Sequence, residues 1–167
     1  VWLVMVDRLK LHNHVLDPMM NLLRFKQHFE RDIRVMLNWD ALLKSGYPVE
    51  LLHFSLPEHA SRVFTPWYAG ADGTVCAYNS PGAVPQSIAD VAKNRALIQH
   101  HGVKSTAPPT TVSTAPGYFL GHGRVLLLDG NHRTVSAQIS GTVFFISVLA
   151  IDGPLDAHLL PDLSHWV

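Results

Sequence analysis

Residues 129–133, Asp-Gly-Asn-His-Arg, combine side chains that could bind an anion and carry a proton. The guanidinium of Arg133 can form two parallel hydrogen bonds to a carboxylate or a phosphate, and the imidazole of His132 titrates near neutral pH. Gly130 permits a tight turn and a close approach to the backbone. We predict a catalytic anion site here, with His132 as the proton carrier. Asp129 is either a base or the acceptor that shapes the turn.

The flanking residues predict that this motif joins a strand to a helix. Residues 125–128 form a short apolar run, which is typical of a strand buried on both faces. Residues 131–140 have a helical pattern that ends at Gly141, and an apolar, β-branched strand is predicted over 142–151. The N–H groups of a first helical turn lack partners within the helix, and with the helix dipole they favour an anion.

The start of this helix supplies the predicted contacts to the anion, which are Gly130, Asn131, Arg133 and Thr134. Structural alternatives exist for several of them. Arg133 could tie the helix start to a neighbouring carboxylate while His132 caps it, and Asn131 could serve only to tolerate the backbone geometry of a turn. The anion site is the favoured interpretation, because the glycine lies between a buried strand and a helix N-terminus.

Candidate side chains also occur far from this motif. His12 and His14 have a spacing that would suit a metal ion on a strand, but a polar loop is the simpler interpretation, and no metal site is predicted. Arg95 is either a second anion contact or part of the exposed face of its helix. The aromatic residues at 67–68 and Tyr78 could stack on a planar substrate or only anchor their loop.

Periodicity and turn residues predict an α+β fold, with a small mixed sheet and helices around it. The remaining predicted elements are a strand over 2–6, helices over 17–33, 38–46 and 87–101, a strand over 49–54, a turn of helix over 57–63, an irregular connection over 65–85 and a hairpin over 118–128.

Composition narrows the class of protein and its partners. The chain has 167 residues, of which 47% are hydrophobic, and its 13 Lys+Arg balance 13 Asp+Glu. Without a basic excess, a small-molecule partner is favoured over nucleic acid. The single Cys76 excludes an internal disulfide and a multi-cysteine zinc site. We see neither a membrane-spanning apolar run nor the form of a signal peptide at 1–6, so we expect a single-domain cytoplasmic protein without membrane contact.

Two blocks of the sequence resemble the ParB/sulfiredoxin superfamily. The first, Val-Met-Val-Asp-Arg-Leu-Lys-Leu-His-Asn at 4–13, is similar to the opening strand and the Leu-Lys-x-His-Glu segment of that superfamily. The second, at about 123–152, contains the Asp-Gly-Asn-His-Arg motif. The resemblance implies core blocks at about 1–37 and 113–153, with a helical or irregular insertion at about 38–112. It also implies that the His-Arg pair binds nucleotide phosphates, with His12 as a further candidate catalytic residue and Asn13 as a further candidate binding residue near this loop.

Departures from the superfamily pattern restrict the activity that the resemblance implies. Asn131 stands where sulfiredoxins have the catalytic cysteine, and Asn13 stands where serine-kinase-like members have the basic glutamate. We expect a stand-alone enzyme that acts on a small anionic or amino-acid-derived metabolite. Phosphotransfer with ATP or ADP and Mg²⁺ is its most concrete version. The alternative is a non-catalytic nucleotide-sensing or nucleic-acid-associated binding module.

Overall fold

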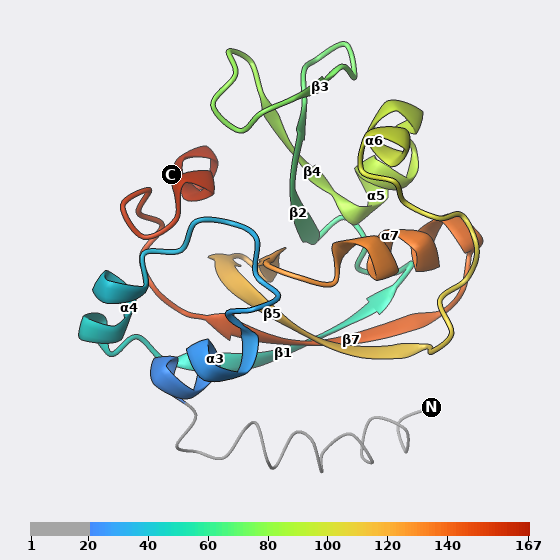
Figure 1. Ribbon diagram of the computed structural model, residues 1–167. Coiled ribbons are helices and arrows are strands. Elements are labelled where there is room, and N and C mark those ends of the chain that lie inside the picture. Colours follow the sequence, from blue (N-terminus) through green and yellow to red (C-terminus); the bar gives the residue numbers. More distant parts are fainter. Residues whose placement is uncertain (1–20) are drawn as a thin grey trace.

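A mixed sheet of seven strands forms the centre of the computed structural model, which describes residues 21–167 (Figure 1). Six strands follow the order β1-β7-β5-β6-β2-β3, and β4 pairs with β2. The pairs β5–β7 and β2–β6 are parallel, and the others are antiparallel. The predicted α+β class is therefore confirmed. The strands are β1 (Val49–Leu56), β2 (Val63–Ala69), β3 (Val75–Cys76), β4 (Val84–Ser87), β5 (Val112–Gly121), β6 (Arg124–Leu127) and β7 (Phe144–Ile151).

Helices cover both faces of this sheet (Figure 1). Helices α5, α6 and α7 lie over one face, and α3, α4 and a 3₁₀ helix, η1, lie over the other. The helices are α3 (Leu22–Phe29), α4 (Trp39–Ser45), α5 (Ile88–Ala92), α6 (Arg95–His100), α7 (Asn131–Ser140) and η1 (Pro161–Trp166). No helix within residues 21–167 is long and apolar enough to cross a membrane.

The interior strand β7 is apolar at every position except Ser147. Ile146 and Val148 belong to the core under α5–α7, whereas Leu149 and Ile151 belong to the core under α3 and α4. Because successive side chains of a strand point to opposite faces, a strand covered on both sides favours apolar residues on both. The predicted strand over 142–151 is thus confirmed from Phe144 onward.

The strand–turn–helix unit around the motif also matches the prediction. The hairpin of β5 and β6 turns at residues 121–123, and α7 spans the predicted 131–140. Gly141 ends α7 in the left-handed conformation, with φ 72°. This is the usual C-terminal role of a glycine, since it has no Cβ to clash there. Helix α4 and strand β1 agree with the predictions over 38–46 and 49–54.

Several predicted elements are wrong in their bounds or kind. Helix α3 ends at Phe29 rather than at residue 33. It begins at Leu22, where the side chain of Asn21 accepts the N–H of Arg24 and caps the helix. The predicted start at 17–18 lies outside the described residues. The predicted helix over 87–101 is two helices. Asn94 interrupts it by accepting the N–H of Leu97 and donating to the carbonyl of Gly73. Residues 57–62 form turns rather than a turn of helix.

The stretch predicted as an insertion, about 38–112, contributes β1 to β4 to the sheet. Strand β1 pairs with β7 along its whole length, and β2 pairs in parallel with β6. The expected irregular connection over 65–85 therefore contains most of β2, together with β3 and the start of β4. These pairings join segments far apart in the chain, so local composition did not indicate them. The predicted strand over 2–6 lies outside the described residues.

Candidate anion-binding site at the start of helix α7

Gly130 forms the corner between strand β6 and helix α7. Its φ of 83° lies in the left-handed region, and no side chain caps the N-terminus of α7. A Cβ added here would lie 3.4 Å from Nη2 of Arg133 and 3.5 Å from Cβ of Ala115. The guanidinium thus folds back over the glycine. Glycine is favoured here by the left-handed backbone of the turn, whereas the contacts of an added Cβ would be at ordinary van der Waals distance.

A groove of about 550 Å³ runs between α7 and the segment that follows α6. Ser136 on α7 donates a hydrogen bond of 2.6 Å to the carbonyl of Lys104, which attaches the segment to the helix. Arg133 and Lys104 bring two cations to the groove, and none of its described lining residues is a carboxylate. The lining residues are Gly102, Lys104, Thr106, Ala107, Pro108, Pro109, Thr110, His132, Arg133 and Ser136.

The imidazole of His132 has a defined tautomer. Its Nε2 lies 2.6 Å from the carbonyl oxygen of His101. Because a carbonyl oxygen only accepts, Nε2 must carry the proton, and in the neutral ring the lone pair is on Nδ1. His132 is exposed and lines the groove. A ring held in this way can take a proton at Nδ1 while the carbonyl stabilises the resulting imidazolium.

Three aromatic rings meet beside this hydrogen bond. Trp67 stacks on His101 with centroids 4.0 Å apart and planes 8° apart, and it meets His132 edge-on at 5.2 Å. Burial, followed by the neighbouring charges of His100 and His132, lowers the pKa of His101 from 6.5 to about 4. His101 is therefore neutral at pH 7, and its carbonyl rather than its side chain orients His132.

The depressed pKa of His101 predicts a loss of stability in mild acid. The side chain of His101 takes up a proton with a pKa of 6.5 in the unfolded chain and of about 4 in the folded chain. Because the unfolded chain binds this proton first, the contribution of His101 to the free energy of unfolding is full above pH 6.5 and is lost as the pH falls to 4. Urea unfolding at pH 7 and pH 4 should show the wild type losing about 1–2 kcal/mol more than His101→Phe, with solvent screening allowed for. The phenyl ring keeps the stack on Trp67 but does not titrate. Equal losses in the two proteins would contradict the prediction.

Of the predicted anion contacts at the helix start, Arg133 lines the groove, whereas Asn131 and Thr134 are buried. Thr134 is buried, and its Oγ1 donates to the carbonyl of Gly130 at 2.7 Å, so it stabilises the first turn and does not line the groove. Asn131 is also buried; its Nδ2 makes a long 3.4 Å contact to the carbonyl of Leu127, and its Oδ1 has no partner among the described residues. Asn131 is therefore an interior residue of the turn and is not among the residues that line the groove.

The remaining described candidates are not among the residues that line the groove. Asp129 precedes the glycine corner and is half-buried, but the group that orients His132 is the carbonyl of His101 and not this carboxylate. Arg95 begins α6, at the opposite end of that helix from His101, and it is not among the residues that line the groove. His12 and Asn13 lie outside the described residues.

Lys104 and the carbonyl of His101 are parts of the site that the sequence did not reveal. Both lie in the segment after α6, about 30 residues before the motif. The sequence signal that existed was Trp67, a predicted stacking residue, which the structure places against His132. Among residues 21–167, no group of three His, Cys, Asp or Glu side chains could hold a metal ion.

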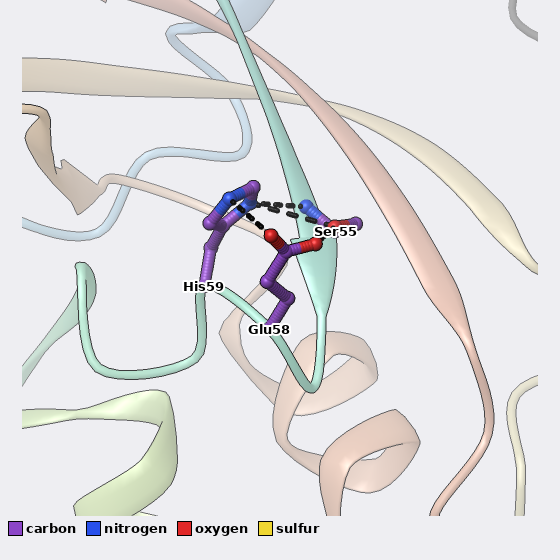
Figure 2. Close-up of polar contacts among 3 residues, drawn as sticks. All are labelled: Ser55, Glu58 and His59. Atoms are coloured by element: carbon purple, nitrogen blue, oxygen red, sulfur yellow. Dashed lines mark hydrogen bonds and ion pairs between the residues drawn. The ribbon is translucent and has the colours of Figure 1, made fainter.

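Ser55, Glu58 and His59 resemble a catalytic triad in composition (Figure 2). Oγ of Ser55 lies 3.5 Å from Nδ1 of His59 and 3.4 Å from Oε2 of Glu58, and Oε1 of Glu58 lies 3.7 Å from Nε2 of His59. However, Nδ1 already accepts the backbone N–H of Ser55 at 3.0 Å. A ring nitrogen has one lone pair, so it is not free to take the hydroxyl proton. This cluster closes the turn between β1 and β2.

The fold and this site together define an α+β protein with a strand–glycine–helix loop beside a basic groove. No protein-family model, curated protein or solved structure matches the chain.

Proposed function

We propose that the chain is an enzyme that binds a small anionic metabolite in the groove between α7 and residues 102–110. One observation carries the proposal. Arg133 and Lys104 line a groove that has no carboxylate among its described lining residues, next to an imidazole whose tautomer is set, and Arg133 lies in the first turn of a helix whose N-terminus has no side-chain cap. Unpaired N–H groups and cations favour an anion, and a positioned imidazole favours proton transfer.

The side chains divide the chemistry between them. Arg133 and Lys104 hold the anionic group, and the hydroxyl of Thr106 is available as a further donor on the groove wall, whereas that of Thr110 donates to the carbonyl of Val112. Nδ1 of His132 takes a proton from a substrate hydroxyl, and the positive charge that forms is stabilised by the carbonyl of His101 across Nε2–H. Substrate choice then depends on the segment 102–110, which forms the wall opposite the helix.

A nucleotide phosphate with Mg²⁺ is the most concrete form of this proposal. Arg133 and Lys104 would hold the phosphates, and Mg²⁺ would be carried mainly by the phosphates themselves, because Asp129, the nearest carboxylate in the sequence, is not among the residues that line the groove. When bound, the ion would neutralise charge on the transferred group. The strand–glycine–helix arrangement supports, as part of the same proposal, a distant relation to the ParB/sulfiredoxin superfamily.

Ligand-dependent stabilisation tests the binding part of the proposal. Inorganic phosphate, ATP, ADP and CTP, each with and without Mg²⁺, are titrated while thermal unfolding is followed. A ligand at 100 times its Kd adds about 2.7 kcal/mol to the free energy of unfolding. Arg133→Gln should weaken the best ligand by roughly tenfold or more, because a charge-assisted bidentate contact is lost. Arg31→Gln, an exposed arginine outside the groove, is the matched control and should bind as the wild type does.

Turnover separates an enzyme from a binding module. The stabilising nucleotide is incubated with the protein and a pool of free amino acids, and ³¹P NMR reports any transferred phosphate. His132→Gln should keep the affinity within about threefold while abolishing turnover. Binding that depends on Arg133 without turnover by the wild type would favour the non-catalytic nucleotide-sensing module. An Arg133→Gln variant that binds every anion as the wild type does would overturn the anion site itself.

A further inference from the structure

A second cavity, of about 580 Å³, borders the ring cluster beside His132. Trp67 and His101 line it, whereas their neighbour His132 lines the anion groove. Most of its other walls are apolar or aromatic and come from Met36, Val75, Tyr68 and Tyr78. We call this cavity the aromatic pocket. Its volume and its lining are those of a pocket for a small molecule.

One polar pair interrupts the apolar wall of the aromatic pocket. Asp162, which is 6% exposed, lines the pocket and accepts a hydrogen bond of 2.6 Å from the hydroxyl of Tyr68. Within residues 21–167, no Lys, Arg or His side chain forms an ion pair with this carboxylate. Burial raises the pKa of Asp162 and outweighs the opposing effects of the Tyr68 hydrogen bond, the backbone N–H and the nearby His165.

Contacts between elements hold the walls in place. Trp67 and Tyr68 come from β2, Asp162 comes from η1, and Tyr78 follows β3. Nε2 of His165, also on η1, donates a 2.6 Å hydrogen bond to the carbonyl of Tyr78. The ring of His165 also packs 4.8 Å from that of Tyr68. The pocket is therefore preformed by three segments attached to one another.

We propose that the aromatic pocket binds a small planar organic cation, whose ring packs on the aromatic walls and whose N–H edge donates to the carboxylate of Asp162. Aromatic faces attract both flat rings and cations. A carboxylate has about four acceptor positions, of which Tyr68 uses one, so the carboxylate can still accept from a ligand. The ligand would also bring the carboxylate a direct ion pair, whereas among the described residues His165 acts on it without forming one.

The charges around the pocket distinguish this ligand from the anion of the other site. An anionic ligand would meet the Asp162 carboxylate at the buried wall, which is unfavourable where little water screens it. The pocket has one arginine, Arg34, which is exposed. Because it is exposed, Arg34 weakens cation binding only modestly. The proposal for the aromatic pocket does not depend on the proposal that the groove binds an anion.

Three ligands with one ring and different charge test the proposal. Benzamidine carries a cationic N–H edge, benzamide has a neutral one, and benzoate is anionic. Each is titrated into the ¹⁵N-labelled protein, and two-dimensional NMR is recorded. Benzamidine should bind most tightly and shift amide signals at 67–68, 75–78 and 162, benzamide should bind more weakly, and benzoate should not bind. Benzoate binding as tightly as benzamidine, or shifts confined to other residues, would overturn the proposal.

Two substitutions of opposite expected effect make this test specific. Asp162→Asn keeps an acceptor for Tyr68 and should weaken benzamidine by roughly tenfold while leaving benzamide nearly unchanged. Arg34→Gln, at an exposed position where folding is not at risk, should tighten benzamidine about twofold. If neither substitution changes the preference for benzamidine over benzamide, Asp162 does not recognise the cation. Arg133→Gln and added phosphate should leave benzamidine binding unaltered, which separates this site from the anion groove.

Discussion

Replacing Gly117 with alanine should lower the free energy of unfolding by about 3 kcal/mol. Gly117 lies in β5, paired with Leu127 on one side and Ala150 on the other. An added Cβ would lie 2.5 Å from Cγ1 of Val148, 2.9 Å from Cγ2 of Val125 and 3.0 Å from the carbonyl oxygen of Leu126. Both valines are fully buried, and the carbonyl belongs to the neighbouring strand, so no neighbour can move without disturbing the sheet.

Urea unfolding at pH 7 measures this effect, and Gly82→Ala is its matched control. Gly82 has φ 75° and nothing within 4 Å of an added Cβ, so alanine there should cost about 1 kcal/mol for conformation alone. Adding Val148→Ala to the Gly117 variant should recover part of the loss, because it removes the closest contact. A cost at Gly117 no larger than that at Gly82 would show that this layer of the core has room to adjust.

Tyr68→Phe should destabilise the protein by about 3 kcal/mol at pH 7, because it leaves the buried carboxylate of Asp162 without its 2.6 Å donor. The effect should shrink in acid. Burial raises the folded-state pKa of Asp162 above its ordinary value of 3.8. A group with a raised pKa contributes stability that is full below the unfolded pKa and is lost as the pH rises through the folded one. At pH 3.5 the carboxyl is protonated, and leaving it without a hydrogen-bond donor costs less free energy. The free energy of unfolding of the variant should therefore approach that of the wild type.

A double-mutant cycle identifies the carboxylate as the cause. Asp162→Leu in the Tyr68→Phe background removes the uncompensated charge, and the bordering cavity gives the leucine room. The double variant should therefore be more stable at pH 7 than Tyr68→Phe alone, with a coupling energy of about 1 kcal/mol or more. Additive effects, together with the same loss at pH 7 and pH 3.5, would mean that Tyr68 acts only through packing.

Local signals in the sequence predicted the unit that carries the candidate site. The apolar run before Asp129, the glycine at 130 and the glycine at 141 specified a strand, a corner and a helix, and the structure places all three there. These features depend on neighbours within a few residues. Asn94 shows the limit of such reasoning: its helical surroundings predicted one helix, but its contact to Gly73, 21 residues away, favours a break.

The sequence by itself determined the α+β class, the helix that begins after Gly130 and the residue types that could bind an anion. Only the tertiary structure decided that Lys104 and the carbonyl of His101 complete that site, that Thr134 is interior, and that Asp162 faces an aromatic pocket. The reason is physical. Propensity, turns and caps act over a few residues, whereas strand pairing, desolvation and the walls of a groove depend on segments that meet only after the whole sheet has formed.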